Sequence, residues 1–259
     1  MMRLACPVCF GELVQTMQVD YCDSCLLSYE WLDLGSGIHN LVPHNLMWDL
    51  TNSAYTAEMT RYDKVTDIGP DLYGGYKASK PQLRAKLMRG LLLTHVIKEY
   101  INVGPGFGEL ETACGDLDRT VVDYSKGFLR YVRELSPLIT CVRGLAERLP
   151  LVTESVGCLV ADSVFQSVIN RELFLYELAR VTAPNALVVL TIAYEWNYPR
   201  RPQNGFNIDN PDELDVLKRF LDELGFDIAL EWYNLNTEAW AVDKARGDIL
   251  YIIGRKRTM

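Results

Sequence analysis

The sequence of 259 residues has no long hydrophobic run and no excess of positive charge. Every apolar stretch, including the one around residues 91–94, is far shorter than the roughly 20 residues that a membrane-spanning helix needs. The first residues also lack the apolar core of a secretory signal peptide, so we expect a cytoplasmic protein without membrane contact. With 26 basic and 34 acidic side chains the net charge is -8, which disfavours binding to a nucleic-acid backbone.

Internal repeats and low-complexity segments are absent too, and the composition has 49% hydrophobic and 23% charged residues. This balance is typical of globular proteins and excludes a disordered chain, a collagen-like fibre and a disulfide-dense miniprotein. The length fits one large domain with a small appendage. We place the boundary after residue 45, with a small module in residues 1–45 and a large domain in residues 46–259.

Four of the seven cysteines form two C-x-x-C pairs that are twelve residues apart: Cys6, Cys9, Cys22 and Cys25. Two such pairs can surround one ion with four thiolates, and zinc suits four soft ligands. The alternatives are two disulfides, which a cytoplasmic setting disfavours, and a redox pair, which lacks its usual strand–helix context. Because a module of about 40 residues buries little apolar surface, we expect a zinc ribbon whose folding free energy comes largely from the metal.

The charge of this module bears on its role. Its first 40 residues hold one basic side chain, Arg3, against five carboxylates: Glu12, Asp20, Asp23, Glu30 and Asp33. Four zinc-bound thiolates would add negative charge. We therefore expect a structural lid or a wall on the substrate side, and not a surface that binds phosphates.

Strands and helices alternate along the large domain. Apolar residues at helical spacing predict a first helix over 81–100, and later helices are expected over 125–135, 171–182 and 210–224. Strands are expected over 100–103, 120–122, 138–142, 156–161, 186–192, 227–233 and 248–254. The alternation predicts an α/β fold with a Rossmann-like, doubly wound, mostly parallel sheet of seven strands. The last two strands have no helix between them, which predicts an antiparallel hairpin at one edge.

Three glycines follow the first of these strands, in the sequence Gly104-Pro105-Gly106-Phe107-Gly108. Glycine lets a ligand approach the backbone closely, and ligands of open α/β sheets bind at the carboxyl ends of the strands. Asp123 ends the next strand, where an acid can accept hydrogen bonds from ribose hydroxyls. Glu109 stands where a dinucleotide fold needs a small residue, which disfavours NAD and FAD. The alternative interpretation is a tight turn without a ligand.

These segments resemble the motifs of the class I S-adenosylmethionine-dependent methyltransferases. Residues 102–109 are similar to the motif beneath the methionine part of the cofactor, 121–125 to the motif at its ribose, and 144–150 to the segment beside its adenine. Residues 160–165 lie where the family's fourth strand ends beside the sulfonium, and residues 177–181 with Pro184 and Asn185 are similar to the family's segment before its fifth strand. The resemblance implies S-adenosylmethionine as cofactor, held by Gly104, Pro105, Gly106, Gly108, Asp123, Tyr124, Ala146, Glu147 and Asp162. Leu145 replaces the family's usual acid at the adenine.

A zinc ribbon ahead of this fold resembles the rRNA guanine-N1 methyltransferases, although Cys25 stands where their motif has histidine. Similar ribbons precede small-molecule methyltransferases of the type 11 families. Residues 162–165 match neither the N-P-P-Y or D-P-P-Y tetrapeptide of base-amino methylation nor the Pro-Cys nucleophile of cytosine C5 methylation. We therefore expect methyl transfer to the oxygen, nitrogen or carbon of a small molecule.

Two alternatives stay open. The first is a 23S rRNA guanine-N1 methyltransferase, which would need a basic surface built from Arg84, Lys86, Arg89, Lys98, Arg200, Arg201 and residues 255–257. The second is a cofactor-binding zinc protein without catalysis, an interpretation that Leu145 keeps open.

Asp162 is the candidate catalytic residue, either as general base or as a group that orients an amine; the alternative is a strand-end residue that touches only cofactor or solvent. His39, His44 and His95 are weaker candidates. The candidate substrate residues follow the fifth strand and are rich in aromatic rings: Tyr194, Trp196, Tyr198 and Arg200, with Trp31 and Trp240 as further members. Such a group suits a flat or aromatic acceptor, and the alternative is ordinary packing of aromatic side chains at the sheet edge.

Overall fold

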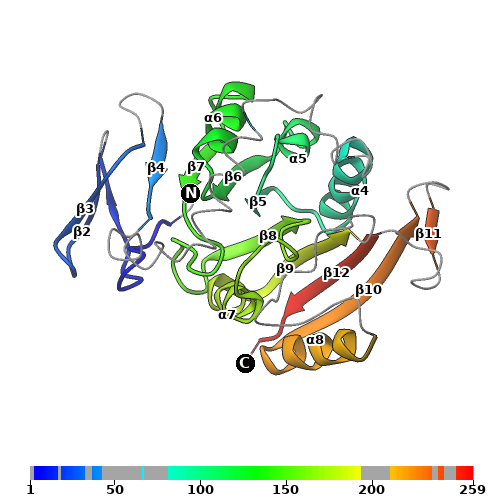
Figure 1. Ribbon diagram of the computed structural model, residues 1–259. Coiled ribbons are helices and arrows are strands. Elements are labelled where there is room, and N and C mark those ends of the chain that lie inside the picture. The colour runs from blue at the N-terminus through cyan, green and yellow to red at the C-terminus, as the bar shows by residue number, and fades with distance from the viewer. Residues whose placement is uncertain are drawn as a thin grey trace.

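The computed structural model describes residues 3–16, 19–32, 37–42, 66, 81–193, 211–234, 239–241 and 249–258. They form a three-stranded antiparallel sheet near the N-terminus and a nine-stranded sheet in the large domain (Figure 1). Within this part of the chain, no helix has the length and apolar character needed to cross a membrane.

The large sheet has the strand order β11-β10-β12-β9-β8-β5-β6-β7-β4. Its strands are β4 (Ile38–Asn40), β5 (Glu99–Val103), β6 (Asp118–Asp123), β7 (Thr140–Arg143), β8 (Val156–Asp162), β9 (Thr182–Ala193), β10 (Phe226–Asn234), β11 (Ala239–Ala241) and β12 (Ile249–Lys256). Neighbours from β9 to β4 are parallel, whereas β12 is antiparallel to both β9 and β10. The predicted seven strands and the C-terminal antiparallel hairpin are thus confirmed, and β4 and β11 extend the sheet at its two edges.

Helices cover both faces of this sheet (Figure 1). On one face lie α4 (Pro81–Thr94), α5 (Glu109–Ala113) and α6 (Lys126–Leu135), and on the other lie α7 (Arg171–Val181) and α8 (Pro211–Glu223). Neighbouring residues of β5 point to opposite faces, as a strand requires. Tyr100 packs with Met88 of α4, whereas Ile101 belongs to the core cluster of Phe174 in α7. The sheet is therefore buried on both sides, as parallel sheets are.

The first helix is shorter than the apolar pattern predicts. It ends at Thr94, because Val96 adopts a left-handed backbone conformation with φ 56°. The amide of Ile97 then donates to the carbonyl of Leu92 at 3.0 Å, which closes the end of the helix.

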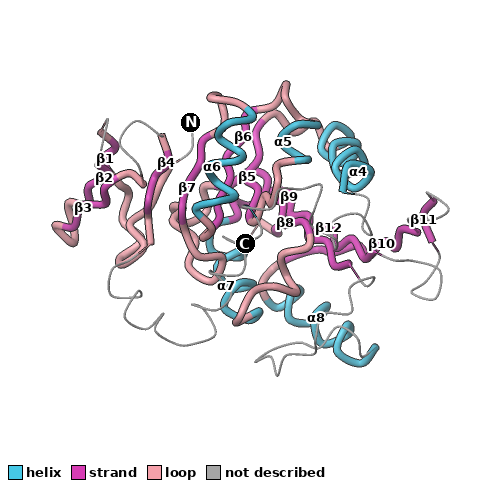
Figure 2. The backbone as a smooth tube through the Cα atoms, turned by 45° about the horizontal axis from the view of Figure 1, so that its top comes forward, coloured by secondary structure: helices cyan, strands magenta, loops and turns pink. Residues whose placement is uncertain are grey.

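The N-terminal module consists of β1 (Val14–Gln15), β2 (Val19–Cys22) and β3 (Leu27–Glu30). Figures 1 and 2 both place this small sheet beyond the β4 edge of the large one. The module packs directly on the large domain, because the amide of Ala5 donates to the carbonyl of Pro150 at 3.0 Å and Leu4 shares a core cluster with Leu149. Although β4 falls within residues 1–45, it pairs with β7. The domain boundary after residue 45 stays a prediction.

Candidate functional site

The glycine turn at the end of β5 has the backbone conformation that its sequence requires. Gly104, Gly106 and Gly108 have φ angles of 70°, 56° and 75°, all in the left-handed region. A Cβ atom on Gly104 would lie 2.3 Å from Cγ2 of Val164, and one on Gly108 would lie 2.5 Å from Cδ1 of Leu135. At Gly106, by contrast, no atom of the described residues, its two chain neighbours aside, lies within 4 Å of such a Cβ. The middle of the turn therefore faces open space, where a ligand can approach the backbone.

Asp123 lies beside this turn, as the last residue of β6. The two strand ends are joined by a 2.8 Å hydrogen bond from the amide of Gly104 to the carbonyl of Val122. The carboxylate of Asp123 is buried and accepts a hydrogen bond from the amide of Ser125 at 2.8 Å. Its backbone carbonyl accepts from the amide of Gly144 at 2.9 Å. The structure thus brings three predicted cofactor segments to one edge of the sheet, and Tyr124 follows directly.

The segment after β7 forms a tight turn with Ala146 and Glu147 at its tip. The amide of Arg148 donates to the carbonyl of Leu145 at 3.1 Å and closes the turn. The Glu147 carboxylate accepts from the amide of Ile169 at 2.8 Å, just ahead of α7. Glu147 therefore fastens the turn to α7, a role that the sequence pattern did not reveal. Cofactor contact by Ala146 and Glu147 stays a prediction.

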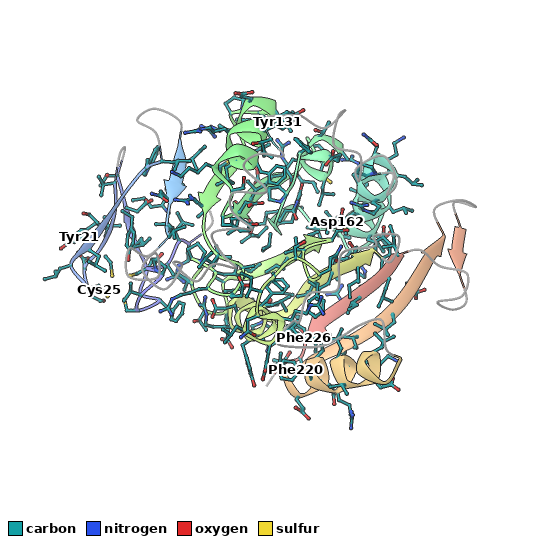
Figure 3. The ribbon with its side chains drawn as sticks, viewed as in Figure 1. Tyr21, Cys25, Tyr131, Asp162, Phe220 and Phe226 are labelled. Atoms are coloured by element: carbon teal, nitrogen blue, oxygen red, sulfur yellow. The ribbon has the colours of Figure 1, made fainter. Side chains whose placement is uncertain are left out.

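Asp162, labelled in Figure 3, is the last residue of β8. Both of its carboxylate oxygens lie 3.2 Å from Nε of Arg84, a buried residue of α4. The carboxylate also accepts hydrogen bonds from the hydroxyls of Thr191 and Ser163. Each of these contacts places a donor against the carboxylate. The arrangement therefore favours a carboxylate that orients a donor over one that acts as general base.

Two glutamates beside the glycine turn have a raised pKa. Burial raises the pKa of Glu109, the first residue of α5, to about 7. Burial also raises the pKa of Glu111 to about 7, although its Oε1 accepts from Nδ2 of Asn102 at 2.8 Å. Oε2 of Glu111 has no hydrogen-bond partner among the described residues. Glu111 was not predicted from the sequence; a useful signal was Asn102, a polar residue in a buried strand that needs a polar partner.

We expect Glu111→Gln to stabilise the protein at pH 8 and to lose this advantage at pH 5. The folded-state pKa lies above the usual value for glutamate, so wild type loses stability as the pH rises from about 4.5 to 7. The neutral glutamine avoids this cost, which a shift of this size puts at about 3 kcal/mol. Urea unfolding at both pH values measures the difference, with the exposed Glu134→Gln as control. If the free energies of unfolding of Glu111→Gln and wild type differed by the same amount at both pH values, the raised pKa of Glu111 would be contradicted.

The predicted histidine candidates and substrate residues are not among the groups described at the strand ends. His39 Nδ1 lies 2.8 Å from Oδ2 of the buried Asp20, and the His39 ring packs edge-on against Trp31. His95 Nδ1 lies 2.9 Å from Nη2 of Arg255. These contacts favour structural roles for both histidines. The predicted substrate residues and one histidine lie outside the described residues: Tyr194, Trp196, Tyr198, Arg200 and His44.

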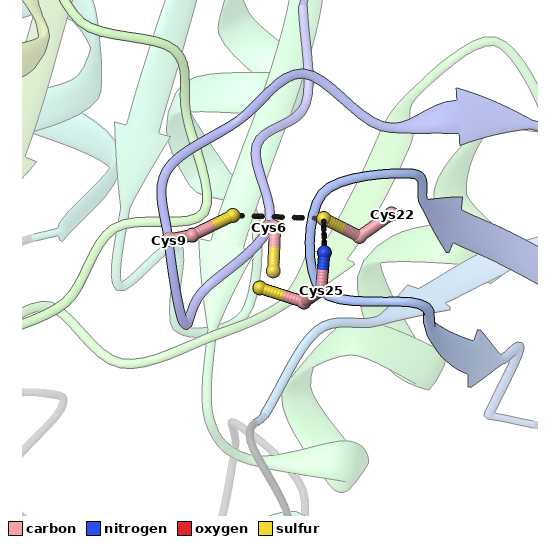
Figure 4. Close-up of side chains that lie close together, drawn as sticks. All are labelled: Cys6, Cys9, Cys22 and Cys25. Atoms are coloured by element: carbon pink, nitrogen blue, oxygen red, sulfur yellow. Dashed lines mark hydrogen bonds between the residues drawn. The ribbon is translucent and has the colours of Figure 1, made fainter.

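The four cysteines of the N-terminal module converge from two segments of the chain (Figure 4). Their Sγ atoms all lie within 4.8 Å of one another, and those of Cys9 and Cys22 are 3.6 Å apart. A tetrahedral zinc ion with Zn–S bonds of about 2.3 Å separates its sulfurs by about 3.8 Å, so the cluster has the size of a zinc site. The amides of Val8 and Cys25 each donate to a cluster sulfur at 3.4 Å. All four thiols are free of disulfides.

Comparisons with known proteins concern the domain that contains this site. Residues 101–190 match a family model described as a methyltransferase domain, whereas no curated protein matches the sequence. A methyltransferase structure from Thermotoga maritima has 16% identity and a TM-score of 0.52, covering 74% of this chain and 99% of its own. The glycopeptide N-methyltransferase MtfA, complexed with S-adenosylmethionine, has 15% identity and a TM-score of 0.50 over 67% of this chain and 87% of its own.

A third similar structure, the [4+2]-cyclase SpnF, has 14% identity and a TM-score of 0.50 over 68% of this chain and 81% of its own. At such identities the likeness concerns the fold alone, and the fold also serves other reactions. The family match is more specific, because it spans the glycine turn, Asp123 and the turn at Ala146. This match, together with a mostly parallel sheet that has an antiparallel C-terminal hairpin, agrees with the resemblance: residues 101–190 match a methyltransferase domain.

Proposed function

We propose that the protein transfers a methyl group from S-adenosylmethionine to the oxygen, nitrogen or carbon of a small molecule, with a flat or aromatic acceptor as the first candidate. The cofactor supplies a methyl group already activated by its sulfonium. The chain has to bind the cofactor, align the acceptor with the methyl group and exclude water.

The residues at the strand ends fit these tasks. The open backbone at Gly106 would lie beneath the methionine part of the cofactor, and Asp123 would accept hydrogen bonds from its ribose hydroxyls. Tyr124 and the backbone of Ala146 would border the adenine. Asp162, held by Arg84, would orient a donor group of cofactor or acceptor. A base is needed only where the acceptor carries a proton at neutral pH.

The observation that supports a small molecule over RNA is the pairing of the cations. Binding to RNA needs several cations that face the phosphates. In the N-terminal module, Arg3 forms an ion pair with Glu12. Most described cations of the predicted basic surface also have intramolecular partners: Arg84 with Asp162, Arg89 with Asp116, Arg255 with His95, Lys256 with the carbonyl of Leu224, and Arg257 with Asp222.

We also propose that Cys6, Cys9, Cys22 and Cys25 hold a structural zinc ion. The support is the size of the cluster and the amide hydrogen bonds to its sulfurs. Thiolates that receive such hydrogen bonds keep their negative charge more readily, which suits a metal ligand.

The function is tested with the full chain, zinc and methyl-labelled S-adenosylmethionine, offered a panel of aromatic acids, phenols and amines beside ribosomal RNA. We expect label in the small-molecule fraction and none in RNA. A salt titration of RNA binding accompanies it, because phosphate contacts give an affinity that falls steeply with salt. Label in RNA together with a steep salt dependence would contradict the proposal and support the guanine-N1 alternative. Cofactor binding without transfer to any acceptor would favour the non-catalytic alternative.

A further inference from the structure

The first cysteine pair is docked on the turn that borders the predicted adenine site. Nε of Arg148 donates to the carbonyl of Pro7, and its Nη2 donates to the carbonyl of Val8 at 2.8 Å. Pro7 and Val8 are the two residues between Cys6 and Cys9. The guanidinium therefore binds the backbone of the metal-binding loop itself.

The same arginine shapes the other side of this contact. Its amide closes the turn with the carbonyl of Leu145, which leaves Ala146 and Glu147 at the tip. Glu147 holds the far side of the tip to the amide ahead of α7. The position of this turn therefore depends on two anchors, α7 through Glu147 and the metal-binding loop through Arg148.

An aromatic ring reinforces the anchor on the metal side. Phe10, directly after Cys9, lies beneath two guanidinium groups, 4.9 Å from that of Arg148 and 4.1 Å from that of Arg180. Arg180 in turn donates to the carbonyl of Leu149 at 2.8 Å. The loop that carries the first two cysteines and the segment from Leu145 to Leu149 are thus held as one packed unit.

A second connection runs through β4. The amide of Leu41 donates to the carbonyl of Arg143 at 2.8 Å, and Nη1 of Arg143 donates to Oδ1 of Asn40 at 3.2 Å. Nε of Arg143 donates to the carbonyl of Tyr124 at 3.1 Å. Residues 40 and 41 are therefore connected to Tyr124 through Arg143, and the metal-binding loop is connected to the turn at Ala146 through Arg148.

We propose that Arg148 is a positioning residue that couples metal binding at the four cysteines to cofactor binding at the adenine end of the site. The inference rests on the proposed cofactor and metal. Without the metal, the carbonyls of Pro7 and Val8 lose their fixed positions and Arg148 loses its acceptors. The turn at Ala146 then gains freedom that cofactor binding has to remove, which weakens the affinity. Because the coupling between two sites is reciprocal, S-adenosylhomocysteine, the product formed from the cofactor, strengthens metal binding by the same factor.

The test measures the affinity of the full chain for S-adenosylhomocysteine by calorimetry, with zinc loaded and after removal by a chelator. For wild type we expect the affinity to fall at least about fivefold on zinc removal, the lower end of ordinary coupling between sites. Competition with a chromophoric chelator measures the zinc affinity with and without S-adenosylhomocysteine, and it should change by the same factor. Arg148→Met keeps an apolar stem but loses both donors. The ratio of its S-adenosylhomocysteine affinities with and without zinc should therefore approach one. The exposed Arg219→Met on α8 should keep the wild-type ratio.

Comparing the two ratios separates coupling through Arg148 from a general loss of stability on zinc removal, which would weaken binding in wild type and in Arg148→Met by the same factor. Arg148→Lys retains one charged donor group and should give an intermediate ratio, and it replaces Arg148→Met if that variant does not fold. A zinc-independent affinity in wild type, or a wild-type ratio in Arg148→Met, would overturn the coupling alone. Failure of zinc-loaded wild type to bind S-adenosylhomocysteine would overturn both the coupling and the proposed function.

Discussion

Cys22→Ser is expected to release the metal and to unfold the N-terminal module. The strands of this module are two to four residues long, so they supply little of its stability. Structural zinc contributes roughly 10 kcal/mol or more to the folding of small zinc modules. Because Leu4 and Leu13 belong to the main core cluster, the loss of stability extends into the large domain. We expect the free energy of unfolding to fall by at least about 4 kcal/mol, a conservative share of that contribution.

Metal analysis and urea unfolding of the full chain measure both effects. Cys141→Ser is the matched control, because Cys141 is a buried thiol in the core cluster of α6, outside the metal cluster. This variant should be destabilised by packing alone and should keep one zinc ion per chain. A Cys22→Ser variant that also keeps one zinc ion per chain would contradict the four-cysteine site.

Asp123→Ala should weaken S-adenosylhomocysteine binding by about 100-fold. The carboxylate lies buried at the end of β6, where the proposed ribose hydroxyls would donate to it. Hydrogen bonds to a charged group contribute about 1.5–3 kcal/mol each, and two of them readily account for a factor of 100. The matched control is Asp118→Ala, which removes an exposed aspartate at the opposite end of the same strand.

Calorimetry of the two variants beside wild type gives the affinities, and thermal unfolding without ligand shows whether each variant is folded. The Asp118→Ala affinity should equal that of wild type. Equal affinities for all three proteins would remove Asp123 from the cofactor site.

The fold could be predicted from the sequence where elements are long and regular. The seven strands expected between residues 100 and 254 are all present, because each has an apolar run that is separated from the next by a helix or a turn. The edge strands β4 and β11 were not predicted, since each has only three residues, too few for a periodic pattern. Their pairing is set by the neighbouring strands β7 and β10.

The candidate site could be predicted only in part, for a similar reason. Parallel strands end at one edge of the sheet, so a glycine turn after β5 and an acid after β6 must meet there. The partners that hold these groups come from distant parts of the chain. Arg84 and Asp162 are 78 residues apart, and Arg148 is 141 residues from Pro7. No local pattern indicates such pairs, which form only when α4 and the N-terminal module pack on the sheet.

The central claim is that the turn at Gly104–Gly108 binds S-adenosylmethionine and no dinucleotide. Calorimetry of zinc-loaded wild type with S-adenosylhomocysteine and, separately, with NAD tests it most directly. The account predicts micromolar binding of S-adenosylhomocysteine and no binding of NAD, whose pyrophosphate would meet the half-buried Glu109 beside the turn. Binding of NAD without binding of S-adenosylhomocysteine would contradict the methyltransferase assignment as a whole.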